Sequence, residues 1–151
     1  MADIVPPDVR SRMMSGIRGK NTRPEIAVRK EMFRRGYRYR LHAKELAGKP
    51  DIVFPRYRAA VFIHGCFWHG HTCPLFKIPS TRPEFWKAKI ARNKENDNKV
   101  TALLIASGWR VATLWECAIR GKKNLGISDV ADALEQWLSS QELIFEIPAS
   151  R

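Results

Sequence analysis

Metal-binding side chains are concentrated in one short stretch of this chain, where the motif GCFWHGHTC (residues 65–73) directly follows His64. The stretch contains two of the three cysteines and three of the four histidines in the sequence. Zinc binds thiolate and imidazole groups, and structural zinc sites use four such ligands with no open position. The ligand types therefore predict a structural zinc site made of Cys66, His71, Cys73 and Cys117. The alternative is three unrelated core cysteines, because cysteine is among the most buried residue types.

A candidate magnesium ligand and two further histidines could supply catalytic chemistry. Asp51 stands between Pro50 and the apolar residues 52–54, at the expected start of a strand. Mg²⁺ prefers hard oxygen ligands and takes one or two carboxylates in addition to phosphate and water. Histidine can donate to a phosphate or accept a proton from water, so His64 and His69 are candidate catalytic residues. In the alternative interpretation, Asp51 only closes a turn and both histidines are zinc ligands or packed polar residues.

Glu25 could add a second carboxylate to such a site. The run TRPE at residues 22–25 has the spacing of a helix capping box, which Glu25 would close together with Thr22. From the first turn of that helix, the carboxylate could also reach hydrated Mg²⁺ if the helix lies over the edge of the sheet. The sequence leaves both roles open.

Three aromatic residues lie in or near the same stretch, namely Phe67, Trp68 and Trp86. Aromatic side chains can wedge between base pairs, at a cost of a few kcal/mol for each unstacked step. That cost is lowest where the duplex is mismatched or flexible. The alternative is a small hydrophobic cluster packed around the zinc.

The charge of the chain favours a polyanionic partner. Lys and Arg number 27 against 15 Asp and Glu, which gives a net charge of +12 and a pI near 10.1. Each phosphate that Lys or Arg neutralises releases counterions, so this excess is typical of DNA-binding proteins. The 151 residues are enough for one domain with its own core. We expect a cytoplasmic protein, because no secretory signal or membrane span is evident and the odd number of cysteines argues against a disulfide framework.

The periodicity of apolar residues predicts a mixed sheet flanked by helices, an α/β fold. Strands are expected at residues 37–41, 51–54, 58–64 and 109–115. The second and third should form an antiparallel hairpin. Helices are expected at residues 7–18, 22–36 and 81–107, with a break near 93–98, and from Ser128 or Asp129 to 140. Residues 143–147 (LIFEI) are expected to be a short apolar tail.

Two long runs of the sequence resemble the very short patch repair (Vsr) endonucleases. They are FIHGCFWHGHTCPLFKIPSTRPEFWKAKI at residues 62–90 and GWRVATLWECAIRG at residues 108–121. The resemblance begins near residue 10 and fades after about residue 125. It implies a restriction-endonuclease-like core, organised as one Vsr-type domain over residues 1–151. Within it, residues 1–20 would form a DNA-contacting helix, and about 126–151 a variable C-terminal helix and tail.

The resemblance also implies an activity and its partners. Such an enzyme nicks one DNA strand on the 5′ side of the mismatched T in T·G pairs, which arise by deamination of 5-methylcytosine, and repair synthesis follows. It would require catalytic Mg²⁺ and structural Zn²⁺. We expect a bacterial monomer that acts on double-stranded DNA, is linked in function to a cytosine-5 DNA methyltransferase, and cooperates with mismatch-repair proteins.

The same resemblance implies catalytic and DNA-binding roles for individual residues. Asp51 would hold Mg²⁺ with the backbone carbonyl of Ile63, and Glu25 would contact the water around the metal. His64 and His69 would act at the scissile phosphate, with His69 as the general base. Phe67, Trp68 and Trp86 would intercalate beside the mismatch from the major groove, and Met14 from the minor groove. Arg and Lys residues within 18–40 would bind phosphates.

Two other functions fit the same residues. One is a restriction-type nuclease that cuts perfectly paired DNA at a defined sequence. The other is a zinc-stabilised DNA-binding module without catalysis, in which the histidines are purely structural. The first predicts cleavage of paired duplexes, and the second predicts binding that does not depend on Asp51.

Overall fold

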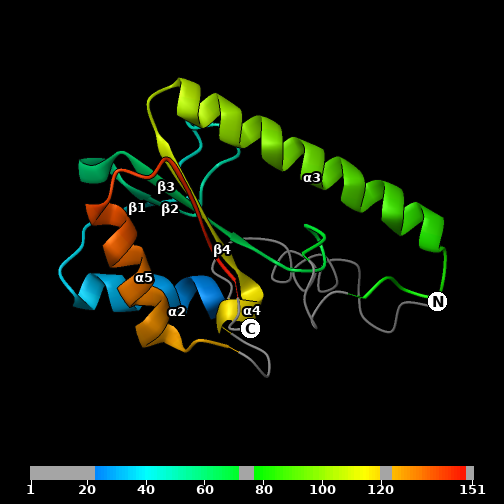
Figure 1. Ribbon diagram of the computed structural model, residues 1–151, viewed down its shortest axis with the longest axis horizontal. Helices are drawn as coiled ribbons and strands as arrows, with labels where there is room; N and C mark the ends of the chain where they lie inside the picture. Colours follow the sequence, from blue (N-terminus) through cyan, green and yellow to red (C-terminus); the bar gives the residue numbers. More distant parts are fainter. Residues whose placement is uncertain (1–22, 72–76, 120–123, 149–151) are drawn as a thin grey trace, which may run out of the picture.

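The computed structural model describes residues 23–71, 77–119 and 124–148, which form one mixed sheet with helices on both faces (Figure 1). The sheet has the spatial order β1-β2-β3-β4-β5. Its strands are β1 (Arg40–Leu41), β2 (Ile52–Phe54), β3 (Ala59–His64), β4 (Arg110–Trp115) and β5 (Ile144–Ile147). The helices are α2 (Arg23–Arg34), α3 (Pro83–Ala106), α4 (Glu116–Ile119) and α5 (Ile127–Ser139), with a 3-10 turn, η1 (Pro55–Tyr57).

The pairing of the strands makes the sheet mixed. β1, β2 and β3 pair antiparallel, and the hairpin expected between residues 51 and 64 forms around η1. β3, β4 and β5 are parallel to one another. The predicted mixed α/β fold is therefore confirmed at this level.

Alternate residues of the central strands face two separate layers of helices. Ala59 and Val61 of β3 belong to the main core, which includes residues of α2 and α5. Ala60 and Phe62 face the other way and pack with Leu104 of α3. This alternation follows from the two-residue period of a strand, and it explains why both faces of β3 are apolar.

The long helix α3 is continuous over its 24 residues, so the break expected near residues 93–98 does not occur. Polar side chains were the reason to expect a break, yet two of them face the rest of the protein. Asn93 donates to the carbonyl of Trp68 at 2.8 Å, and Asp97 lies 2.6 Å from His69. One stripe of α3 is buried or half-buried along its length, at Trp86, Ile90, Asn93, Asp97, Val100 and Leu104.

Four other expectations need correction. The strand expected at 37–41 is reduced to β1, because Tyr37 and Tyr39 pack against the main core instead. The tail LIFEI is a strand, β5, which adds to the sheet beside β4. The run TRPE at residues 81–84 has the same capping-box spacing, but the box does not form, because Arg82 caps α3 in a left-handed conformation with no side-chain hydrogen bond. Helix α5 begins at Ile127 after Gly126, not after Ser128 or Asp129.

Several expectations concern residues outside the described ranges. The helix at 7–18, Thr22 of the first capping box, Met14 and Cys73 all belong to this group. Helix α2 itself ends before Gly36 as expected, with Gly36 at a φ of +98°. Within the described ranges, no helix combines the length and the apolar character that crossing a bilayer requires.

Candidate functional site

The topology of the sheet brings the metal-rich stretch together with Cys117. β3 and β4 are parallel, and His64 at the end of β3 is paired with Trp115 at the end of β4. Both strands therefore end on the same side of the sheet. Cys66 lies two residues after His64, and Cys117 lies two residues after Trp115. Residues far apart in the sequence therefore converge because two parallel strands end together.

Three of the four predicted zinc ligands are gathered at this edge. The ligand atoms of Cys66, His71 and Cys117 all lie within 4.8 Å of one another, and His71 Nδ1 is 3.5 Å from Cys117 Sγ. The His71 ring stacks on Trp115 with centroids 4.2 Å apart. Both cysteines are buried. We call these three residues the sulfur–imidazole cluster. Its soft donors fit zinc, and the fourth predicted ligand, Cys73, lies outside the described residues.

A second cluster joins helix α2 to the first strands of the sheet. Ligand atoms of Glu25, His42 and Asp51 also lie within 4.8 Å of one another, and we call this group the carboxylate cluster. Glu25 is only 1% exposed although it carries a carboxylate. Its Oε2 accepts hydrogen bonds from Arg29 Nη1 and lies 2.9 Å from His42 Nε2. The two carboxylates match the hard oxygen ligands that Mg²⁺ prefers.

Asp51 is held at the edge of the sheet by a backbone group. Its Oδ2 accepts a hydrogen bond of 2.7 Å from the N–H of Ile63 on the neighbouring strand β3. Burial raises the pKa of Asp51 from 3.8 to about 6; the Ile63 N–H opposes this shift and the nearby Glu25 carboxylate adds to it. The ionised form therefore costs free energy unless a cation compensates it.

The two histidines predicted to be catalytic lie against each other. The rings of His64 and His69 are stacked, with centroids 3.7 Å apart and planes within 3°. His69 Nδ1 lies 2.6 Å from Asp97 Oδ2 of α3, so this nitrogen carries a proton and donates it to the carboxylate. The other ring nitrogen of His69 is then the basic one. Asp97 fixes both the orientation and the tautomer of His69.

His64 is neutral in this environment. Burial, together with the adjacent His69, lowers the pKa of His64 to about 3, whereas an ordinary histidine titrates at 6.5. Its Nδ1 is buried without a hydrogen-bond partner among the described residues. A neutral imidazole can donate or accept a hydrogen bond at a phosphate, but it brings no positive charge to the site.

The three predicted DNA wedges form one aromatic cluster. Phe67 and Trp68 meet edge to face at 5.1 Å, and both contact Trp86 at the start of α3, at 5.4 and 5.8 Å. All three are half-buried. The hydrogen bond from Asn93 to the carbonyl of Trp68 ties this part of the loop to α3. None of the three belongs to the main core.

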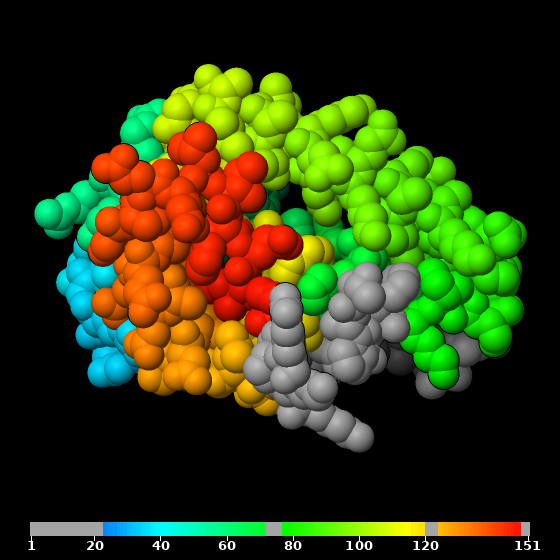
Figure 2. Space-filling model, viewed as in Figure 1, coloured from blue at the N-terminus to red at the C-terminus, as the bar shows by residue number. Residues whose placement is uncertain are grey.

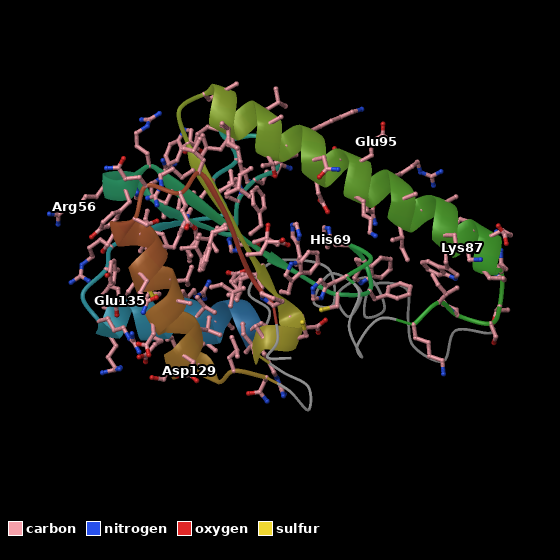
Figure 3. The ribbon with its side chains drawn as sticks, in the orientation of Figure 1. Arg56, His69, Lys87, Glu95, Asp129 and Glu135 are labelled. Carbon is pink, nitrogen blue, oxygen red and sulfur yellow. The ribbon has the colours of Figure 1, made fainter. Side chains whose placement is uncertain are left out.

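One cleft connects the two carboxylates, the histidine pair and part of the aromatic cluster. It has a volume of about 830 Å³, and its lining includes Glu25, Asp51, His64, Phe67, Trp68 and His69. A second cavity of about 920 Å³ shares His64, His69 and Asp97 with the first and lies beneath α3, where Figure 2 shows a hollow. Figure 3 shows His69 between the sheet and α3, whereas Glu95 lies on the outer side of that helix.

Three residues near the site were not predicted from the sequence. His42 and Asp97 contact Glu25 and His69, and Glu116 Oε1 accepts a hydrogen bond from the N–H of Cys66. Asp97 could have been predicted to face the site, because it lies eleven positions after Trp86 on the same face of a helix. Glu116 directly precedes a predicted zinc ligand, which is a weaker signal. No pattern in the sequence pointed to His42.

The sequence matches known DNA-cleaving enzymes. A family model described as DNA mismatch endonuclease Vsr matches residues 2–75. The type II nicking enzyme V.XorIIP of Xanthomonas oryzae is 49% identical over 119 residues, which cover 79% of this chain and 88% of that protein. DNA mismatch endonuclease Vsr of Escherichia coli is 40% identical over 141 residues, covering 93% and 90%. The type II nicking enzyme V.NmeAIP of Neisseria meningitidis is 45% identical over 122 residues, covering 81% and 87%.

Proposed function

Because this chain belongs to the Vsr family of DNA mismatch endonucleases, we propose that it is a Mg²⁺-dependent enzyme that nicks DNA on the 5′ side of the T in a T·G mismatch. The observation that carries this proposal is the cleft in which two carboxylates, a histidine pair and aromatic side chains meet. A binding module would need no such combination. The mispairs would arise by deamination of 5-methylcytosine, so the nick would start very short patch repair.

The residues of the carboxylate cluster fit the metal that this reaction needs. Asp51 would hold Mg²⁺ together with the backbone carbonyl of Ile63, whose N–H already binds Asp51, and Glu25 would contact the water around the metal. When bound, Mg²⁺ polarises the scissile phosphate and stabilises the leaving oxyanion. The sulfur–imidazole cluster, completed by Cys73, would hold a structural Zn²⁺.

The chain's own side chains would then handle the proton and the phosphate. His69 is the general base, because Asp97 holds its Nδ1 proton and leaves the other ring nitrogen to take a proton from the attacking water. His64, stacked on it and neutral, would hydrogen-bond the phosphate. The attacking water must lie on the His69 side of the scissile bond for this transfer to occur.

The aromatic cluster would select the mismatch. Phe67, Trp68 and Trp86 would insert from the major groove and Met14 from the minor groove, which costs less at a T·G pair than at a matched pair. Arg and Lys residues within 18–40 would bind the phosphates and make binding salt-dependent. The DNA would be chromosomal, in the bacterial cytoplasm, at sites of a cytosine-5 DNA methyltransferase, with mismatch-repair proteins acting nearby.

The proposal also covers the organisation of the chain. Residues 1–151 would act as one monomeric domain with a restriction-endonuclease-like core, in which residues 1–20 contact DNA. The segment from about 126 would vary between relatives, although α5 and β5 are part of the folded unit here. The relatives named type II nicking enzymes support the nicking of one strand.

A nicking assay tests the proposal directly. End-labelled duplexes would carry one T·G pair at the centre of candidate methyltransferase sites, and matched duplexes would carry the same sites fully paired. We expect one nick 5′ to the T that requires Mg²⁺ and disappears with EDTA. Equal cleavage of the paired duplexes would identify a restriction-type nuclease instead. Tight binding without cleavage of any duplex would support the binding module.

A further inference from the structure

His42 connects the two carboxylates of the carboxylate cluster. Its backbone N–H donates to the carbonyl of Asp51 at 3.0 Å, next to the pairing of β1 with β2. Its side-chain Nε2 lies 2.9 Å from Oε2 of Glu25 on α2. One residue therefore contacts the backbone of one carboxylate residue and the side chain of the other.

The backbone of His42 is held in an uncommon conformation. Its φ of +50° lies in the left-handed region, which non-glycine residues rarely adopt and which costs free energy. The chain turns sharply after β1 at this point, so the side chain points back toward α2 and not along the strand. The side chains of His42 and Glu25 are 16% and 2% exposed. The contact between them is therefore largely shielded from water.

The hydrogen bond has a defined direction. An ionised carboxylate can only accept, so Nε2 of His42 carries the proton and donates it to Glu25. The nitrogen that faces the cluster is thus occupied as a donor and is not a metal ligand. Arg29 also donates to Oε2 of Glu25, but Arg29 belongs to the same helix and its bond does not link α2 to the sheet.

We propose that His42 is a positioning residue, which holds the Glu25 carboxylate beside Asp51 so that both face one divalent cation. Ligating carboxylates are commonly oriented by hydrogen bonds from outside the ligand shell, and loss of such a bond typically weakens metal affinity or activity about tenfold to a hundredfold. This role rests on the proposed function only in its assumption that Asp51 and Glu25 serve one metal, Asp51 as a ligand and Glu25 through the water around it. It assigns no charge to His42.

Metal binding by purified protein tests the role without DNA cleavage. Mn²⁺ is the probe, and electron paramagnetic resonance measures the free ion. We expect His42→Leu to weaken Mn²⁺ binding about tenfold or more, because the hydrogen bond from the turn after β1 to the Glu25 carboxylate is lost. We expect His42→Gln to keep the wild-type affinity, because its amide can donate to the same oxygen. Equal affinity in all three proteins would overturn the proposal, and so would equal weakening in both variants.

A matched control removes a nearby hydrogen bond that does not touch the cluster. Tyr39 donates from its hydroxyl to the carbonyl of Arg29 at 2.9 Å, so it also ties the β1 region to α2. Tyr39→Phe should lower the melting temperature and leave Mn²⁺ affinity unchanged. If Tyr39→Phe weakened Mn²⁺ binding as much as His42→Leu, weaker packing of α2 on the β1 region would explain both results. That outcome would contradict a specific role of His42.

Cleavage kinetics complete the test and separate it from the proposed function. His42→Leu should raise the Mg²⁺ concentration that half-saturates nicking, while the Kd for mismatched DNA measured in Ca²⁺ stays unchanged. A wild-type protein that binds Mn²⁺ through Glu25 and Asp51 but nicks no DNA would refute the function and leave the role of His42 standing. A wild-type enzyme that nicks T·G DNA, with His42→Leu identical in metal dependence, would refute only the role of His42.

Discussion

The sulfur–imidazole cluster and the carboxylate cluster each bring three polar or sulfur side chains together, yet the fold builds them differently. In each, side-chain nitrogen, oxygen or sulfur atoms of three residues lie within 4.8 Å of one another, although His42 in the carboxylate cluster donates to Glu25 and is not a ligand. The first cluster comes from the loop after β3 and from α4 after β4, two segments that leave one sheet edge together. The second cluster comes from a helix, a turn and the residue before β2, which belong to three separate elements.

The difference indicates that bringing three polar or sulfur side chains together can either raise or lower the stability of the fold. Thiolate and imidazole groups are satisfied by one soft cation, so metal binding at the first cluster should fasten a loop that has little core of its own. At the second cluster, burial raises the pKa of Asp51, and repulsion from the neighbouring Glu25 carboxylate raises it further. The first cluster should stabilise the fold, and the second should cost stability for the sake of chemistry.

Loss of the Asp51 carboxylate should produce the largest effect. Asp51→Asn keeps an oxygen that can accept the Ile63 N–H but removes the charge that would hold Mg²⁺. We expect the single-turnover rate of nicking to fall at least about a thousandfold, because metal stabilisation of the transition state is worth several kcal/mol. Asp129→Asn on the exposed start of α5 is a matched control and should keep full activity. Full activity of the Asp51→Asn protein would contradict the proposed metal site.

Loss of the sulfur–imidazole cluster should lower the stability of the folded protein. Cys117→Ser should abolish a zinc content of about one ion per chain and lower the free energy of unfolding by at least about 3 kcal/mol. A strong chelator should bring the wild-type protein down to the stability of the variant and leave the variant unchanged. That comparison separates loss of the metal from the cost of a buried hydroxyl. Metal analysis and thermal unfolding measure both, and freshly purified protein without zinc would contradict the cluster's role.

The same Asp51→Asn variant should be more stable than the wild type in the absence of metal. Above pH 6, the ionised Asp51 costs the folded state up to about 3 kcal/mol, since its pKa is raised from 3.8 to about 6. Between pH 6 and pH 4 the folded protein takes up that proton before the unfolded chain does, so the penalty disappears. The stability difference should therefore be largest at pH 7.5 and vanish near pH 4, as measured by urea unfolding in EDTA.

A smaller effect is expected at His69, which belongs to neither cluster. His69 lies in the loop that carries Cys66 and His71, but its orientation depends on Asp97 of α3. Asp97→Asn should lower the nicking rate about a hundredfold, the scale of general-base catalysis, while zinc content and melting temperature stay unchanged. A variant that lost zinc as well would show that Asp97 supports the loop and not only His69.

Much of this arrangement could be predicted from residue types and spacing. The hairpin at residues 51–64, the strand ending at Trp115 and the helices beginning at residues 23 and 83 follow strong local patterns. Cys66, His71 and Cys117 were predicted to converge, and the structure gathers all three. These features could be predicted because they depend on residue types and on short-range spacing, both of which can be read from the sequence.

What could not be predicted depends on tertiary contacts. Asn93 and Asp97 looked like helix breakers, but each finds a partner in the loop after β3, and α3 continues through them. The tail LIFEI becomes a strand only because the edge of β4 is available beside it. His42 reaches Glu25 through a left-handed turn that no short pattern announces. In each case the deciding partner is distant in the chain.

The continuous stripe of α3 places a constraint on chain length. Trp86, Asn93 and Asp97 reach their partners because they share one helical phase, and each residue of an α-helix turns by about 100°. Inserting or deleting one residue between Trp86 and Asp97 would rotate one half of the stripe away from the loop. Substitutions on the outer face of α3, where Glu95 lies, should be tolerated. Single-residue insertions and deletions in this helix should not be, so α3 should keep its length while its exposed sequence drifts.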